Sequence, residues 1–342
     1  MKKILTLSCV LLGLLARPAV FAADLPISIP SASVEPAAND SAEAAAPTKG
    51  KAYAPTDYPT CVRVEPDVNY LGAGRSERAD IYSPLQMPKD VRLPAILIIH
   101  GGGFNDGDKA RPREINFCTN LVAQGYVCMS INYRLRKKAG DVTWPQSLYD
   151  AKTAVRWLRK NADRLGIDPF RIGVMGGSAG GNLAAMLALT QPKDGFDLPE
   201  PCGEFSSAVS CGVDFYGAVK LMDYHDMKMF NQTRAEAPEL YLKASPVTYA
   251  HKTAAPMLIV HGTADMTVPP SQSEALAEAL EKAGAEHELV MIPGAAHTFN
   301  LQPPQRDLRP LVFRFFDRHL KGKSVLANSA STGSSANNIV TP

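Results

Sequence analysis

The stretch from Gly173 to Leu189 constrains the fold of this chain more than any other, because an apolar run ends there in a glycine-flanked serine. Its centre, Gly176-Gly177-Ser178-Ala179-Gly180, has the pattern G-x-S-x-G. The residues before it are typical of a buried strand, and the small residues after it are typical of a buried helix. On a sharp strand-to-helix turn, a base can reach the serine hydroxyl and the helix N-terminus faces a developing oxyanion. Ser178 is therefore the candidate nucleophile.

Short apolar runs and amphipathic helices alternate through the rest of the chain. This alternation predicts an α/β domain with a mostly parallel central sheet and helices on both faces. Ser271 and Glu274 have the spacing of a helix-starting capping box, and Gly166 and Gly284 are typical of helix ends. The predicted strands cover residues 62–70, 78–82, 95–99, 126–131, 171–175, 208–215, 256–261 and 288–292. The predicted helices cover 114–124, 145–165, 183–189, 271–284 and 306–320.

Three chemically complementary residues follow the ends of three different predicted strands. Ser178, Asp265 and His297 each stand just after such a strand. The carboxyl ends of parallel strands share one edge of a sheet, so we expect these side chains to converge. His297 would take the serine proton and return it to the leaving group, while Asp265 would fix the imidazole tautomer. The chain order Ser, Asp, His is the order found in α/β-hydrolases.

A glycine-rich loop, His100-Gly101-Gly102-Gly103-Phe104, follows another predicted strand. Backbone N–H groups at such a loop and at the start of a helix can bind the oxyanion of an acyl-transfer intermediate. We therefore expect Gly102, Gly103 and Ala179 to form the oxyanion hole.

Other residues near this edge are expected to contact substrate. Phe104 and Gly177 are predicted to do so, and residues 107–113 and 220–251 to shape the acyl and alcohol sites. The second stretch has weak periodicity and fits a lid or pocket wall, or an ordinary surface connection.

Several residues compete for these roles. Asp214, at the end of the strand predicted for residues 208–215, is the alternative to Asp265 as the acid. His100 is interpreted as bracing the glycine loop, His261 as buried structure and Asp150 as an ion-pairing or capping residue. The remaining histidines are expected to be solvated or to pack: His225, His251, His287 and His319.

The ordered set of motifs resembles the α/β-hydrolase fold carboxylesterases. The set comprises the His100 loop, the Ser178 turn, the stretch from His261 to Asp265 with Val268-Pro269, and the stretch from Pro293 to His297. It is most similar to the bacterial acetylxylan- or feruloyl-esterase-like branch, near the hormone-sensitive-lipase group. The resemblance implies the α/β-hydrolase fold, with about eight strands, and a triad of Ser178, Asp265 and His297.

Two departures from the family pattern bear on substrate. No helical cap precedes the glycine loop, which favours an open cleft over a lipid-binding one, and Phe104 stands where many relatives have Trp. The expected activity is hydrolysis of short acyl esters through an acyl-enzyme, with acetyl or feruloyl groups on polysaccharide as candidate substrates. The alternatives are a prolyl-oligopeptidase-like peptidase and a non-catalytic binding module. The expected reaction needs no metal or cofactor, and no Cys/His spacing indicates a zinc site.

The two ends of the chain differ from the middle in composition. Residues 1–22 have the pattern of a secretory signal peptide, which predicts a secreted or periplasmic protein without a membrane span. Residues 23–60 form an Ala/Pro/Ser-rich spacer, 61–320 the catalytic domain and 321–342 a disordered tail. Three cations lie in the signal segment, so the formal charge of +2 becomes −1 without it. This charge gives no indication of a nucleic-acid partner.

Export would place five cysteines where disulfides persist. Cys202 and Cys211 are close in a loop-like region and are the predicted pair.

Overall fold

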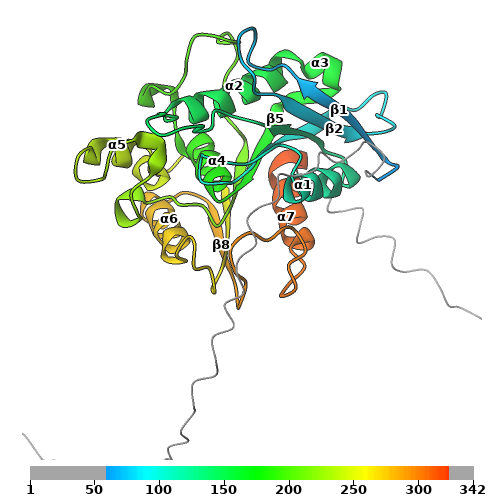
Figure 1. Cartoon of the computed structure of the whole chain (residues 1–342). Helices are drawn as coiled ribbons and strands as arrows, with labels where there is room; N and C mark the ends of the chain where they lie inside the picture. The colour runs from blue at the N-terminus through cyan, green and yellow to red at the C-terminus, as the bar shows by residue number, and fades with distance from the viewer. Residues whose placement is uncertain (1–58, 323–342) are drawn as a thin grey trace, which may run out of the picture. The chain divides into compact units, whose positions relative to one another are not determined.

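The computed structural model describes residues 59–322, which are coloured in Figure 1. The predicted signal peptide, the spacer up to residue 58 and the tail from residue 323 lie outside the described residues.

One eight-stranded sheet forms the centre of the domain (Figure 1). From one edge to the other, its strands are β1 Val62–Val68, β2 Ala79–Pro84, β4 Val127–Ile131, β3 Leu93–Ile99, β5 Ile167–Gly177, β6 Cys211–Phe215, β7 Met257–Gly262 and β8 His287–Ile292. β2 pairs antiparallel with both β1 and β4, whereas every pair from β4 through β3 and β5 to β8 is parallel. All eight predicted strands are present, so the prediction of a mostly parallel α/β sheet is confirmed.

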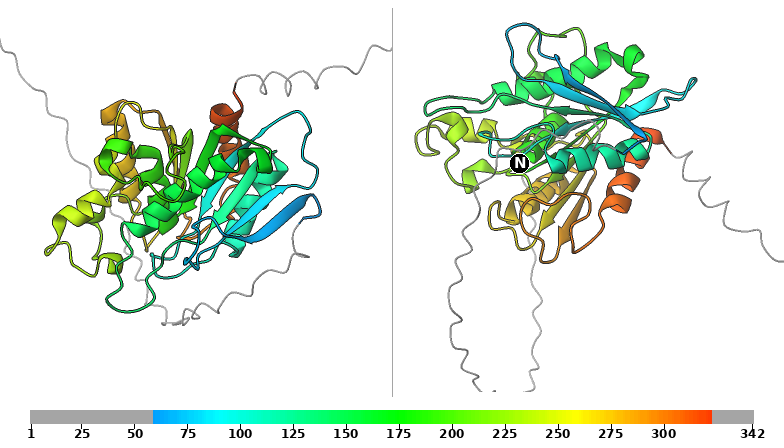
Figure 2. Two further views of the ribbon diagram at one scale, coloured as in Figure 1. Left: turned by 90° about the horizontal axis from the view of Figure 1, so that it is seen from above. Right: turned by 45° about the vertical axis from the view of Figure 1, so that its right-hand side comes forward.

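Helices cover both faces of the sheet, as the two further views in Figure 2 show. The alternating side chains of β3 explain why: Leu97 belongs to one buried cluster, and its neighbours Ile96 and Ile98 belong to another. Apolar residues of α1 (Pro112–Ala123) and α7 (Arg309–Phe316) join the second cluster. Residues of α2 (Gln146–Lys160) and α4 (Ala179–Leu189) join the first, and α6 (Ser271–Ala283) packs beside α4.

The helix ends are set by glycine where the sequence indicated it. Gly166 ends α3 (Ala162–Leu165) at φ +64°, and Gly284 ends α6 at φ +68°, both left-handed conformations that favour glycine. The helix predicted over 145–165 is divided at Asn161 into α2 and α3. The predicted capping box is wrong: Pro270 is the N-cap of α6, so Ser271 is already helical and its side chain makes no cap.

The stretch of weak periodicity forms short, well-packed elements. Met229, Phe230 and Tyr241 within it are buried. The short elements of the domain are η2 Pro192–Asp194, η3 Leu221–Asp223, η4 Lys228–Phe230, α5 Pro238–Lys243, η5 Pro246–Tyr249 and η6 Asp317–Lys321.

The predicted disulfide between Cys202 and Cys211 is wrong, since both thiols are free. Cys211 begins β6 and its side chain belongs to the cluster under α7. The loop that carries Cys202 is tied to α2 on the other face by hydrogen bonds from Arg156 to Leu198 and from Arg159 to Ser206. The sheet therefore separates two cysteines that are close in sequence.

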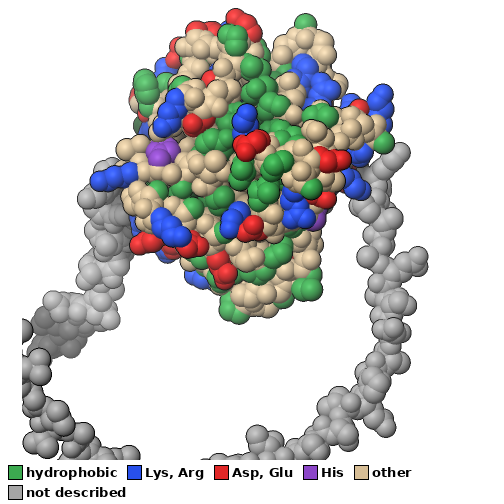
Figure 3. All heavy atoms as spheres, turned by 90° about the vertical axis from the view of Figure 1, so that its left-hand side faces the viewer, with side chains coloured by type: hydrophobic (Ala, Val, Ile, Leu, Met, Phe, Trp, Pro, Cys, Tyr) green, Lys and Arg blue, Asp and Glu red, His purple; other side chains and the backbone are tan. Residues whose placement is uncertain are grey.

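Within residues 59–322, no helix combines the length and apolarity needed to cross a bilayer. Figure 3 shows that basic and acidic side chains are interspersed on the face that lies to the left in Figure 1.

Candidate active site

Ser178 stands on a strained turn between β5 and α4. Its φ is +59° and its ψ −121°, and its N–H donates to the Phe215 carbonyl at 2.8 Å. A Cβ on Gly176 would lie 2.2 Å from the Gly180 oxygen, and one on Gly180 would lie 2.1 Å from the Ile99 oxygen. Only glycine fits at these two positions, so the motif allows β5, α4 and β3 to approach closely enough to form the turn.

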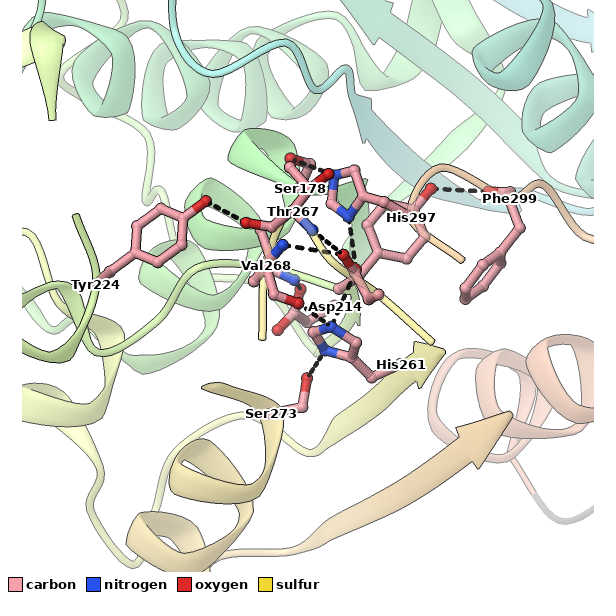
Figure 4. Close-up of polar contacts among 12 residues, drawn as sticks. Ser178, Asp214, Tyr224, His261, Thr267, Val268, Ser273, His297 and Phe299 are labelled. Carbon is pink, nitrogen blue, oxygen red and sulfur yellow. Dashed lines mark hydrogen bonds and ion pairs between the residues drawn. The ribbon is translucent and has the colours of Figure 1, made fainter. Parts of the chain in front are cut away.

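The three residues predicted to converge do so, and Figure 4 shows two of them, Ser178 and His297, side by side. His297 Nε2 lies 3.0 Å from Ser178 Oγ, and His297 Nδ1 lies 2.6 Å from Asp265 Oδ2. The Asp265 side chain is fully buried, and the His297 side chain retains 15% exposure. The histidine thus reaches the serine hydroxyl with one ring nitrogen and the carboxylate with the other, the arrangement that nucleophilic catalysis by serine requires.

The Asp265 carboxylate accepts four hydrogen bonds. Oδ1 accepts from the backbone N–H groups of Thr267 and Val268, at 2.8 and 2.9 Å. Oδ2 accepts from His297 and also lies 3.1 Å from His261 Nε2. Burial opposes ionisation of this carboxyl, but the hydrogen bonds from His297, Val268 and Thr267 outweigh burial and hold its pKa below the ordinary value. The acid is therefore ionised and able to stabilise an imidazolium.

The glycine loop lies next to Ser178, since a Cβ on Gly101 would be 3.1 Å from the Ser178 Cβ. Gly102 and Gly103 have φ values of +113° and +60°, and a Cβ on Gly102 would lie 2.0 Å from the Asp106 oxygen. Ala179 is the first residue of α4, where the N–H has no partner within the helix. All three residues line the same cavity as Ser178 and His297. The three residues expected to form the oxyanion hole thus share one cavity wall with the nucleophile.

The cavity over Ser178 measures about 700 Å³. Phe104 lines it but is almost wholly buried, so it forms part of the wall. Gly177 does not lie among the described residues that line the cavity: its Cα faces Tyr216 and Arg113 behind the nucleophile. Its predicted contact with substrate is corrected on this ground. Both predicted shaping stretches reach the cavity, through residues 111–113 and 224–228.

His100 and Asp150 occupy the supporting positions predicted for them, whereas His225, expected to be solvated or to pack, lines the cavity. His100 Nδ1 donates to the Gly101 oxygen at 2.7 Å, and the His100 ring stacks on Tyr133 with centroids 4.4 Å apart. Burial lowers the pKa of His100 to about 4, so the imidazole that holds the glycine loop is neutral.

Asp150 is an ion-pairing residue, as expected: Arg75 forms a two-point ion pair with it, at 2.9 and 2.6 Å. In residues 59–322, no group of three Cys, His, Asp or Glu side chains is arranged to hold a metal ion.

Three residues near the triad were not expected from the sequence to support it. His261, interpreted as buried structure, contacts the triad carboxylate. Tyr216 packs its ring against His297 with centroids 4.8 Å apart, and its hydroxyl donates to the Phe299 oxygen at 2.7 Å. Arg113 Nη1 donates to the same hydroxyl at 3.2 Å. Ser178 and Asp265 were predicted because each follows the end of a strand, and this strand-end rule would also have selected Tyr216, which follows β6. No sequence signal marks Arg113 as a residue that supports the triad.

A family model and the sequences of curated relatives assign the chain to the same group of proteins. Residues 79–280 match the BD-FAE family model. Esterase LipQ of Mycobacterium tuberculosis is 33% identical over 252 residues, which are 69% of this chain and 57% of LipQ. The chain spans a little over half the length of LipQ and of two further curated mycobacterial relatives, LipC and LipM.

Two solved structures have the same fold and higher mutual coverage. A truncated carbohydrate esterase from gut microbiota superimposes with a TM-score of 0.69 at 26% identity, covering 79% of this chain and all of that one. The propionate-bound esterase Est2 of Thermogutta terrifontis gives 0.62 at 30% identity, covering 77% and 94%. The chain therefore belongs to the BD-FAE family and has the α/β-hydrolase fold of the carboxylesterases.

Proposed function

We propose that the protein is a serine carboxylesterase that hydrolyses short-chain acyl esters. One observation carries the proposal: an unbroken hydrogen-bond path runs from Asp265 through His297 to Ser178 at a cavity of about 700 Å³. Such a path converts a weakly nucleophilic hydroxyl into an attacking group.

Each step of the reaction has a group in place. Ser178 Oγ attacks the ester carbonyl carbon while its proton passes to His297 Nε2. The N–H groups of Gly102, Gly103 and Ala179 then bind the oxyanion of the tetrahedral intermediate. The C–O bond to the alcohol breaks as His297 returns the proton to the leaving oxygen, leaving an acyl-serine. Water activated by His297 hydrolyses this acyl-enzyme and restores the hydroxyl.

The size and lining of the cavity fit an ester whose acyl or alcohol part carries a ring. Its volume is within the range of small-molecule sites. Tyr224 and His225 line it with their rings 4.0 Å apart, and an aromatic wall of this kind suits the face of a sugar ring or a feruloyl group. The propionate in the Thermogutta esterase and the name of the gut carbohydrate esterase support the same substrate class. We therefore propose acetyl or feruloyl groups on polysaccharide as candidate natural substrates.

We also propose that the protein is exported to the periplasm or beyond the cell. The support is the pattern of residues 1–22, which lie outside the described residues.

The test is ester hydrolysis by the purified protein and by Ser178→Ala. We expect wild type to hydrolyse p-nitrophenyl acetate, and the variant to lose at least about a thousandfold in kcat because no group replaces the nucleophile. A circular-dichroism melt shared by the two proteins would show that the variant is folded. Hydrolysis at the wild-type rate by folded Ser178→Ala would refute the proposal.

A panel of substrates then defines the class. It contains p-nitrophenyl esters of increasing acyl length, acetylated xylan, feruloyl sugars and a Pro-aminoacyl anilide. Preference for the anilide would favour the peptidase alternative.

A further inference from the structure

A second histidine shares the carboxylate of the proposed triad. His261 is the fifth residue of β7, and its side chain is fully buried, as is that of Asp265. Its Nε2 lies 3.1 Å from Asp265 Oδ2, the same oxygen that accepts from His297 at 2.6 Å. In Figure 4, His297 and Ser178 lie above His261 and Ser273.

The contacts of the His261 ring define its tautomer. Nε2 faces Asp265 and also the Val268 carbonyl at 2.9 Å. A carboxylate and a carbonyl only accept hydrogen bonds, so Nε2 carries the proton and donates to both. Nδ1 lies 2.6 Å from the Oγ of buried Ser273 on α6, whose hydroxyl can donate to it. The ring is therefore a neutral donor held in one orientation from both sides.

We infer that His261 is a positioning residue for the catalytic acid: by donating to Asp265 Oδ2 and Val268 O, it fixes the carboxylate and withdraws part of its negative charge from His297. The inference rests on the proposed esterase function. His261 is not among the described residues that line the cavity, so its effect on substrate passes through Asp265 and His297.

The charges around His297 determine in which direction the pH profile moves when the His261 donor is removed. The neighbours of His297 are Asp265, Ser178, His261 and the ring of Tyr216, whose hydroxyl is held by Arg113. Without the donor on Oδ2, the carboxylate attracts the imidazolium more strongly. The acidic limb of kcat/KM, which reports the ionisation of the essential base in the free enzyme, then moves to higher pH.

The experiment compares His261→Phe, His261→Gln and Ser273→Ala on p-nitrophenyl acetate between pH 4 and 9. We expect His261→Phe to lower kcat about tenfold, the worth of one hydrogen bond to a charged group, with KM within about twofold of wild type. The acidic limb of the kcat/KM profile of His261→Phe should move to higher pH by about half a unit. His261→Gln keeps an N–H donor of similar reach and should restore most of kcat and the wild-type limb. Ser273→Ala, which loosens the ring, should give a smaller shift in the same direction.

Each outcome decides a different question. A wild-type protein that hydrolyses no ester refutes the proposed function. The positioning role is overturned if the wild type is active and His261→Phe is folded but the acidic limb of its kcat/KM profile does not move. This holds even if kcat falls. If His261→Phe does not fold, Ser273→Ala decides, and an unmoved limb there overturns the inference.

Discussion

The ends of the neighbouring strands β6 and β7 each place a buried aspartate at the same edge of the sheet, with opposite electrostatic outcomes. Asp265, beyond β7, accepts four hydrogen bonds, and its pKa lies below the ordinary value. Asp214, in β6, accepts one, from the Gly217 N–H at 2.9 Å, and its Oδ2 is among the buried atoms of the described chain without a hydrogen-bond partner. Burial raises the pKa of Asp214 to about 7.

The difference shows that position at the sheet edge does not by itself make a catalytic acid. Both residues satisfy the strand-end rule, which is why Asp214 remained an alternative in the sequence. The deciding feature is the loop after β7, which turns the N–H groups of Thr267 and Val268 back onto the carboxylate. A carboxylate with several donors stays ionised in a buried site, whereas one with a single donor tends to protonate.

Asp265→Asn gives the largest effect in this comparison. The amide cannot stabilise the imidazolium and favours the wrong tautomer of His297, so we expect kcat to fall by about a thousandfold or more. Steady-state kinetics on p-nitrophenyl acetate would measure it, with Ser178→Ala as the baseline for complete loss. Retention of more than a tenth of the wild-type kcat would show that another group serves as the acid.

Asp214→Asn is the matched control at the neighbouring strand. We expect kcat within about threefold of wild type, because an amide resembles the protonated acid that Asp214 is at acidic pH. A loss as large as that of Asp265→Asn would reverse the assignment of the two aspartates.

The same variant has a defined effect on stability. Folding raises the pKa of Asp214 from 3.8 to about 7, so the folded chain binds the proton more tightly. The resulting stability is fully present below the unfolded pKa and is lost as pH rises towards 7. Asn does not titrate, so the Tm of Asp214→Asn relative to wild type should increase between about pH 4 and 7 and then level off. Parallel melting curves for the two proteins would contradict the buried, protonated state of Asp214.

Tyr216→Phe should have a much smaller effect than Asp265→Asn, because the ring that packs on His297 remains. Its hydroxyl joins the Phe299 carbonyl, two residues after His297, to Arg113. Losing this tie should lower kcat about three- to tenfold through a less fixed imidazole. Comparing kcat and KM would test it: a change in KM alone would indicate a role in substrate binding, against this account.

The strands could be predicted because each is a short apolar run bounded by proline, glycine or polar residues. The run from Ala95 to Ile99 shows this, since both of its faces are buried. The path of the loop between Cys202 and Cys211 relative to the sheet could not be predicted in this way. Cys202 and Cys211 are nine positions apart in the sequence, but the chain between them passes from the α2 face into the sheet. The start of α6 also depends on tertiary context, which moved the N-cap to Pro270.

The site could be predicted as far as strand ends and glycine motifs determine it. Ser178, Asp265 and His297 each follow the carboxyl end of a parallel strand. Because these strand ends meet at one edge of the sheet, the convergence of the three side chains could be predicted. His261 and Arg113 contribute through contacts that depend on side-chain direction. Whether a buried histidine faces the core or a carboxylate four residues later is set by the turn after β7, which the sequence pattern does not define.

Covalent labelling tests the central claim most directly: the hydroxyl of Ser178 is activated by His297 and Asp265. The protein would be treated with a fluorophosphonate probe, digested and analysed by mass spectrometry, beside Ser178→Ala and Asp265→Asn. The account predicts one adduct, on Ser178, absent from Ser178→Ala and formed much more slowly in Asp265→Asn. An adduct at a different serine, or equal labelling rates for wild type and Asp265→Asn, would contradict it.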